Sequence, residues 1–149
     1  MVIRVATVND IDTLCEMGSR FLAFAPHGKH VNTTAEDYRS GCEAFMRFGT
    51  VFIAERDGKA CAMLACAIMP VWFAPSILMA HELAWWVDED ARGSSAAVRL
   101  VRAFEEFARE SGARIIAMSQ LHAVNGEQVG RMLTKLGYEP SEMTYIKGA

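Results

Sequence analysis

The chain has 149 residues, of which 52% are hydrophobic and 22% charged, and its formal net charge is −3. A chain of this length is expected to fold as one domain that buries about 70% of its unfolded surface, and its apolar runs are too short to span a membrane. The absence of a basic run disfavours nucleic acid as a partner. Residues 1–5 do not resemble a signal peptide, so a cytoplasmic location is predicted.

Alternating and near-continuous apolar runs predict strands at residues 2–6, 51–55, 59–69, 77–87, 114–119 and 143–147. Helical spacing of apolar residues predicts four helices: one capped by Asn9 or Asp10 and reaching 22, one from 33 or 34 to 48, one at 97–110 and one at 127–136. The Asp57-Gly58 pair predicts a tight turn between antiparallel strands. Residues 70–75, which begin and end with proline, are expected to form an apolar loop.

The cysteines and histidines show no metal-binding pattern. The four cysteines are Cys15, Cys42, Cys61 and Cys66, and no two have C-x-x-C spacing. We expect free thiols in a reducing compartment rather than disulfides, and no bound metal.

The segment from Val87 to Ala97 leads from a predicted strand into an amphipathic helix through small residues. Small side chains let several backbone N–H groups face one phosphate-sized anion, and the helix N-terminus adds about half a positive charge. A helix start capped by Ser94 or Ser95 is the alternative. The predicted anion cradle consists of Arg92, Gly93, Ser94, Ser95, Ala96 and Ala97.

The pattern Arg92-x-x-Ser95-x-Ala97 resembles motif A of the GCN5-related N-acetyltransferases (GNAT), Q/R-x-x-G-x-G/A, which holds the pyrophosphate of acetyl-CoA. The order of the predicted elements also resembles this family, as does the N-terminal segment at residues 3–7. The segment at residues 133–138 is similar to the family's LYxKxGF motif. The resemblance is greatest to small bacterial and phage members. The resemblance implies one GNAT domain over residues 1–149. Its fold would be α/β of the α+β kind, with four helices around a mixed, mostly antiparallel sheet of six to seven strands.

The resemblance also implies that acetyl-CoA is the co-substrate and that a small-molecule or peptidic primary amine is the acceptor. In the family, the strand before the cradle separates from the strand after the cradle helix, and its free backbone groups bind the pantetheine arm. Trp85, Trp86 and Val87 take this place here, and Asn125 matches an asparagine that bonds the cofactor arm, with a helix N-cap as its competing role. Serine at position 95, where glycine is usual, must avoid a positive φ or accept strain.

Glu82 is a lone carboxylate in an apolar strand, at a position where some GNAT enzymes carry a general base. Alternation would put Glu82, Ala84 and Trp86 on one face and His81 on the other. A carboxylate desolvated beside Trp86 would have a raised pKa, as suits a general base. A solvent-facing or ion-paired Glu82, with an ordered water as the base, is the alternative.

The family often uses a tyrosine on the last helix to protonate the leaving thiolate, but this sequence has Leu133 there. Ser119 and Tyr138 are the remaining candidates for that general acid.

The resemblance places the acceptor between the first two helices and the loop after the third strand. The residues it brings there are Phe24, His27, His30, Trp72 and Phe73. This aromatic, mildly basic rim indicates an amine of apolar or anionic character, although such aromatics are also typical of a core or a homodimer interface. A catalytically idle CoA-binding protein and a protein-interaction module are the alternative functions.

Overall fold

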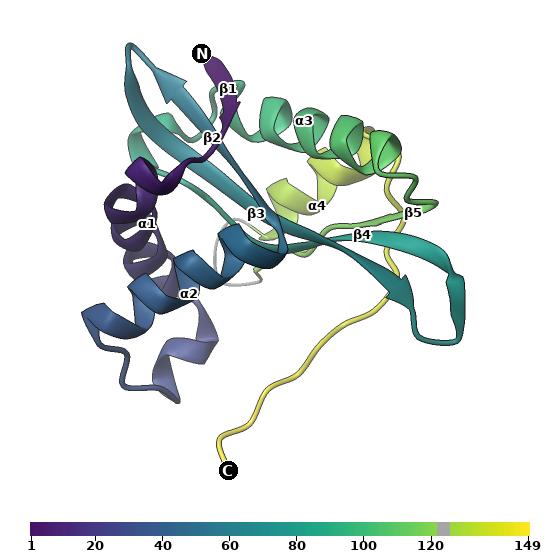
Figure 1. Ribbon diagram of the computed structural model, residues 1–149, viewed down its shortest axis with the longest axis horizontal. Helices are drawn as coiled ribbons and strands as arrows, with labels where there is room; N and C mark the ends of the chain where they lie inside the picture. Colours follow the sequence, from purple (N-terminus) through teal and green to yellow (C-terminus); the bar gives the residue numbers. More distant parts are fainter. Residues whose placement is uncertain (122–125) are drawn as a thin grey trace.

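The computed structural model describes residues 1–121 and 126–149. Its sheet has five strands among these residues, in the order β1-β2-β3-β4-β5 (Figure 1). The strands are β1 (Val2–Val5), β2 (Thr50–Arg56), β3 (Lys59–Val71), β4 (Ala74–Val87) and β5 (Ile115–Ala117). The first four pair antiparallel in sequence order and β5 pairs parallel to β4, which confirms the predicted mixed, mostly antiparallel sheet.

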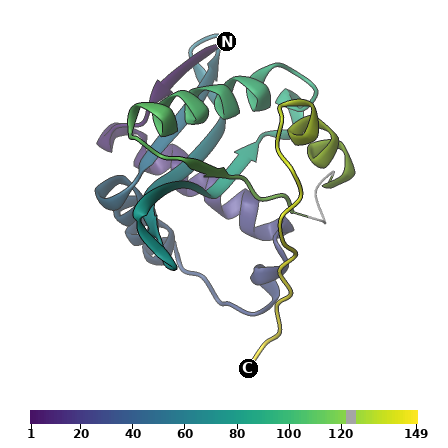
Figure 2. The same ribbon diagram turned by 90° about the vertical axis from the view of Figure 1, so that its right-hand side faces the viewer.

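The described residues also form four α-helices, as predicted, and three short 3-10 turns. The helices are α1 (Ile11–Phe24), α2 (Ala35–Phe48), α3 (Ala96–Glu110) and α4 (Gly126–Lys135), and the turns are η1 (Val8–Asp10), η2 (Pro26–Lys29) and η3 (Glu89–Ala91). The helices α1 and α2 cover one face of the sheet, α3 covers the other, and α4 lies beside the start of α3 (Figures 1 and 2). None of the described helices is both long and apolar enough to cross a membrane.

Two apolar clusters hold the three layers together. On α3, Leu100, Phe104 and Ala108 recur every fourth residue, so they form one buried stripe against the sheet. Successive residues of a strand point to opposite faces, and so Leu64 of β3 joins the α3 cluster while Met63 joins the cluster under α1.

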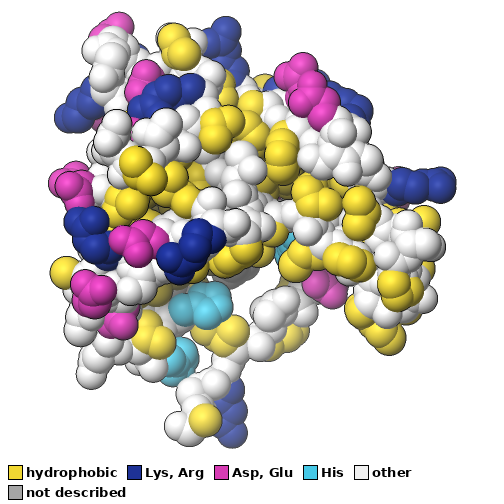
Figure 3. Space-filling model, viewed as in Figure 1, with side chains coloured by type: hydrophobic (Ala, Val, Ile, Leu, Met, Phe, Trp, Pro, Cys, Tyr) yellow, Lys and Arg dark blue, Asp and Glu magenta, His cyan; other side chains and the backbone are white. Residues whose placement is uncertain are grey.

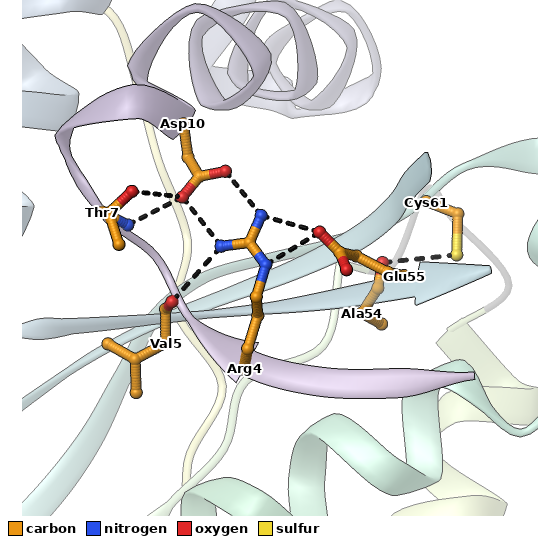
Figure 4. A network of polar contacts seen from close by, with 7 residues as sticks. All are labelled: Arg4, Val5, Thr7, Asp10, Ala54, Glu55 and Cys61. Carbon is orange, nitrogen blue, oxygen red and sulfur yellow. Dashed lines mark hydrogen bonds and ion pairs between the residues drawn. The ribbon is translucent and has the colours of Figure 1, made fainter. Parts of the chain in front are cut away.

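An ionic network ties the first strand to the start of α1 (Figure 4). The Arg4 guanidinium donates to both carboxylate oxygens of Asp10, at 2.8 and 2.7 Å, and its Nε donates to Glu55 at 2.8 Å. The amide of Thr7 also donates to Asp10, at 2.7 Å. These contacts hold the pKa of Asp10 well below its usual range, chiefly through the hydrogen bonds from Arg4.

The predicted loop at residues 70–75 is shorter in the structure. Strand β3 continues through Pro70, and β4 begins one residue before Pro75, so the turn consists of Trp72 and Phe73 alone. This part of the hairpin extends beyond β2 as a two-stranded ribbon, where a proline can face solvent instead of a ladder partner.

The predicted final strand at residues 143–147 is wrong. Residues 136 and 137 form a turn that ends α4, residues 138–149 form a tail with neither helix nor strand, and the predicted strand at 114–119 shortens to β5. Met143 and Tyr145 are 75% and 85% exposed. An alternating apolar pattern becomes a strand only beside a free sheet edge, and in this chain the tail does not pair with β5. The described sheet therefore has five strands rather than six to seven.

Candidate active site

Strands β4 and β5 pair along only one end of β4. Residues 79–81 of β4 face residues 115–117 of β5. In the described part of the chain, no residue of β4 from 82 to 87 has a partner on its β5 side. Apart from the carbonyl of Val87, which accepts from Arg92, the backbone of this segment therefore has N–H and C=O groups available to a ligand that enters between the two strands.

A β-bulge in β4 changes which face its side chains occupy. Glu82 pairs with Cys66, whereas Ala84 pairs with the adjacent residue of β3, which leaves Leu83 as the extra residue. Paired residues share a face, so Glu82 lies with Cys66 on the α3 side, whereas Ala84 and Trp86 pack on the α1 side. The prediction that Glu82, Ala84 and Trp86 share one face is wrong, because the bulge interrupts the alternation.

Glu82 lies where β4 and β5 separate, and its side chain is held from the β5 side. Its carboxylate accepts a hydrogen bond from the backbone amide of Ser119 at 3.0 Å, and the residue is only 5% exposed. Burial raises the pKa of Glu82 to about 7, although the hydrogen bonds from Ser119 partly oppose this. Among the described residues, no cation forms an ion pair with Glu82. The solvent-facing and ion-paired alternatives therefore do not fit the structure.

Trp85 also bonds to the backbone of Ser119. Its indole N–H donates to the carbonyl oxygen of Ser119 at 3.2 Å. The backbone of Ser119 is thus bonded to β4 through both its amide and its carbonyl, although β5 itself ends two residues earlier.

The start of α3 has the geometry of an anion cradle. Gly93 has φ of +80°, a conformation that glycine adopts without steric cost. Ser95 has φ of −75°, so the structure has no strain at this position. The hydroxyl of Ser94 accepts from the amide of Ala96 at 3.2 Å, but the amides of Gly93, Ser95 and Ala97 have no acceptor in the part of the chain that the structure describes. These N–H groups are available to a bound anion.

Arg92 lies beside the cradle and is held by two aromatic rings. Its Nε donates to the carbonyl of Val87 at 3.1 Å, and its Cζ lies 4.8 Å from the ring centre of Trp86 and 5.7 Å from that of Phe24. Its Nη2 is buried, and among the described residues it has no hydrogen-bond partner. A buried guanidinium N–H without a protein acceptor suits a phosphate oxygen.

A cavity of about 220 Å³ joins the cradle, Arg92 and the end of β4, whereas Glu82 and Ser119 do not line it. It is bounded by the end of β4, the segment before α3, the start of α3 and one side of α4. Of the residues predicted to bind the cofactor, those that line it are Trp85, Trp86, Val87, Arg92, Gly93, Ser94 and Ala97. Ser95 and Ala96 do not line it with the others, and Asn125 lies outside the described residues.

The residues predicted to bind the acceptor are not brought together. Phe24 lies at the end of α1, next to His27 on η2 and His30 just after it. Trp72 and Phe73 pack edge to face, with ring centres 5.2 Å apart, at the tip of the β3–β4 hairpin, on the opposite side of the molecule in Figure 1. They are 88% and 70% exposed. Phe24 adjoins the cavity at the cradle through its contacts with Trp86 and Arg92.

Two residues that hold the site in place were not found from the sequence. Asp88 accepts from the indole N–H of Trp86 at 2.7 Å and from Nε of Arg20 at 3.0 Å. This network fixes the indole against Arg92 and ties the end of β4 to α1. The position of Asp88 two residues after Trp86 could have indicated their contact from the sequence. The contact of Asp88 with Arg20, 68 residues away, had no such signal.

The sequence matches the Acetyltransferase (GNAT) family over residues 19–138, and the chain belongs to this family. The family uses acetyl-CoA as its co-substrate. No curated protein matches the sequence.

Solved structures share the fold over nearly the whole chain. One is a transcriptional regulator from Bacillus halodurans, with a TM-score of 0.79, 17% identity and 99% coverage of both chains. Another is an acetyltransferase with acetyl-CoA from Clostridium acetobutylicum, with a TM-score of 0.76, 18% identity and coverage of 98% of this chain and 95% of that one. An aminoglycoside antibiotic 6'-N-acetyltransferase from Acinetobacter haemolyticus has a TM-score of 0.74, 17% identity and coverage of 100% and 98%. At these identities the likeness concerns the fold.

Proposed function

We propose that this chain is an N-acetyltransferase that catalyses direct attack of a primary amine on acetyl-CoA. The observation that carries the proposal is the open edge of β4, which has buried Glu82 at one end and the anion cradle at the other. Membership of the family supports acetyl transfer, and this arrangement supports cofactor binding at the cradle and proton removal at Glu82, which lies farther along β4, outside the cavity at the cradle.

The cradle would hold the pyrophosphate of acetyl-CoA through the amides of Gly93, Ser95 and Ala97, with Arg92 adding a charge-assisted hydrogen bond. The open backbone of β4 from Trp85 to Val87 would bond the pantetheine arm. This placement leads the reactive end of the cofactor toward Glu82. The role of Asn125 stays a prediction.

Glu82 is proposed as the group that removes the proton from the amine. Primary amines are mostly protonated near neutral pH, with a pKa near 10, and only the neutral form attacks a carbonyl. A carboxyl whose pKa is about 7 is substantially ionised at neutral pH and can accept the proton directly or through a water. Once protonated it is neutral, a form that its buried position favours.

The bound acetyl-CoA supplies the acetyl group as a thioester, so the new C–N bond forms as the C–S bond breaks and the thiolate needs a proton. The hydroxyl of Ser119, next to Glu82, is the proposed donor, and it receives in turn the proton that Glu82 has taken from the amine, so that both side chains return to their starting states. Tyr138 is a poorer candidate because its buried hydroxyl lies near Glu105, in the second half of α3, and burial raises its pKa.

A CoA-binding protein without turnover is the second candidate function. Leu133 is 8% exposed, so it fills a core position and has no proton to donate where the family often has tyrosine. The structural likeness to a protein named as a transcriptional regulator fits a binding role as well.

Thiol release during incubation with acetyl-CoA and a panel of primary amines separates the two candidates. The proposed transferase releases CoA only when an amine is present, and the product is the acetylated amine. Intact-mass measurement of the protein after incubation with acetyl-CoA alone should show no acetylated enzyme. CoA binding without release on any amine would instead favour the idle protein, and an acetylated enzyme would contradict direct attack.

A further inference from the structure

A second cavity, of about 440 Å³, lies between the second half of α1, η2 and the start of α2. Phe24 and Tyr38 give it aromatic walls, and Leu22 and Val31 add aliphatic surface. The turn η2 lies tightly against α1, because a Cβ on Gly28 would come within 2.4 Å of the carbonyl oxygen of Leu22. The cavity is therefore bounded by elements whose positions are fixed by close packing.

Phe24 connects this cavity to the cofactor cavity. Its ring lies 5.4 Å from that of Trp86 and packs against the guanidinium of Arg92, and both of these residues line the cofactor cavity. A molecule in the second cavity would thus be separated from the cofactor cavity by one aromatic ring. An acceptor whose body occupies this cavity would enter beside Trp86, and its amine would extend along the open edge of β4 toward Glu82, where the thioester is proposed to lie.

The electrostatic character of this cavity is unusual for a site that binds amines. Among the described residues that line it, Lys29 is the one charged side chain, and none is a carboxylate. Figure 3 shows histidine side chains at the lower left, where η2 lies, and another patch of histidine nearer the middle of the face. No negative charge lines the cavity to accept a second or third ammonium group.

Three aspartates on or near the flanking helices are engaged elsewhere, and the glutamates of α1 and α2 (Glu16, Glu36 and Glu43) do not line the cavity. Asp12 of α1 forms an ion pair with Arg39 of α2. Asp37 accepts hydrogen bonds from the amide and hydroxyl of Thr34, so it serves the cap of α2. Asp88 is bonded by Arg20, as described above. These three aspartates are thus already held by partners of this chain.

We infer that the acceptor is an amine on an apolar or aromatic body that carries no further positive charge. The inference rests on the proposed function and specifies its substrate class. The cavity is open to solvent, so each additional ammonium of a polycation such as an aminoglycoside would keep much of its water, but it would meet Lys29 and no carboxylate partner. An apolar body gains instead from contact with Phe24, Tyr38 and Leu22, and a carboxylate on the acceptor would meet Lys29.

The test compares phenethylamine, phenylalanine and kanamycin as acceptors, with thiol release for turnover and isothermal titration with CoA present for binding. We expect kcat/KM for kanamycin to be lower than for either aromatic amine by about tenfold. Lys29→Glu should raise KM for phenylalanine about fivefold relative to KM for phenethylamine, which has no carboxylate to meet Lys29. Lys59→Glu, the same change at the exposed β2–β3 turn, is the matched control and should alter neither.

The two readouts separate the failure of this inference from that of the proposed function. Turnover of kanamycin at a rate equal to or above that of the aromatic amines would overturn the inference and leave the transferase function intact. Binding of the aromatic amines but not kanamycin, without thiol release, would support the inferred acceptor class and overturn the transferase function. No binding or turnover of either aromatic amine, or an equal effect of Lys29→Glu and Lys59→Glu on phenylalanine, would contradict the inference.

Discussion

The carboxylate of Glu82 accepts a hydrogen bond from the backbone amide of Ser119, 3.0 Å away, at the point where β4 and β5 stop pairing. The bond closes one end of the gap that lies beside the cofactor cavity. It also places the one buried carboxylate of β4 at that end, so the ionisation of Glu82 and the shape of the gap depend on the same contact.

Replacement of Glu82 by glutamine should remove the proposed base while preserving the shape of the side chain. We expect kcat to fall about a hundredfold, within the range of 10² to 10⁴ that a positioned base contributes, while the affinity for acetyl-CoA is retained. The wild-type rate should rise with pH through about 7, where Glu82 becomes ionised. The variant should lose that step and partly recover at high pH as free amine accumulates. Wild-type turnover of Glu82→Gln across the pH range would contradict the role and favour a water as base.

Glu82→Gln should also change the stability of the fold in a pH-dependent way. The pKa of Glu82 is about 7 in the folded protein and about 4.5 in the unfolded chain, so the folded state holds the proton more tightly. Its contribution to the free energy of unfolding is complete below pH 4.5 and is lost as the pH rises through 7. At pH 8, Glu82→Gln should therefore be more stable than the wild type, by up to about 3 kcal/mol, and this advantage should shrink toward pH 5. Urea denaturation of both proteins at pH 5 and pH 8 measures the difference in their free energies of unfolding. A difference that does not change with pH would show that Glu82 is not the titrating group.

The contact between Arg92 and Trp86 should affect cofactor binding more than turnover. Arg92→Ala should weaken acetyl-CoA binding by roughly tenfold to a hundredfold, because a charge-assisted hydrogen bond contributes about 1.5 to 3 kcal/mol. Trp86→Leu removes the ring beneath the guanidinium and the bond to Asp88. A double-mutant cycle on the acetyl-CoA dissociation constant should give a coupling of about 1 to 2 kcal/mol between these residues. Additive effects would mean that the ring does not position Arg92.

The Arg4–Asp10–Glu55 network should stabilise the fold in a pH-dependent way. Asp10→Asn should lower the free energy of unfolding at pH 7 by about 1 to 2 kcal/mol, since the hydrogen bonds involve charged groups but Arg4 remains partly exposed. The pKa of Asp10 is depressed, so its contribution is present above pH 4 and is lost as the pH falls further. Asp12→Asn, which breaks an exposed ion pair with Arg39, is the control and should cost less than about 0.5 kcal/mol. Equal costs for the two variants would contradict this account.

Local patterns in the sequence were sufficient for most of the fold. The apolar spacing on α3, the Thr34 cap of α2 and the Asp57-Gly58 turn each depend on neighbouring residues, and each lies where it was predicted. The strand at 143–147 failed because strand formation requires a partner edge, and this requirement is not visible within five residues.

The site was only partly predictable for a similar reason. The small residues from Gly93 to Ala97 revealed the cradle, because backbone access to an anion depends on local side-chain size. The face of Glu82 was predicted wrongly because the bulge at Leu83 is fixed by pairing with β3. The contact of Arg20 with Asp88 joins distant elements, so no spacing in the sequence could indicate it.

The central claim is that the start of α3 and the open edge of β4 hold acetyl-CoA. The most direct measurement is the shift in melting temperature that acetyl-CoA causes in the wild type, in Ala97→Asp and in Ala35→Asp, an equivalent change at the exposed start of α2. At a hundred times its dissociation constant, the ligand adds about 2.7 kcal/mol and should raise the melting temperature by roughly 5 to 10 °C in the wild type and in Ala35→Asp. The shift should disappear in Ala97→Asp, which places a carboxylate where the phosphates approach the backbone. A wild-type melting curve unmoved by millimolar acetyl-CoA, or a folded Ala97→Asp protein with the full shift, would contradict the claim.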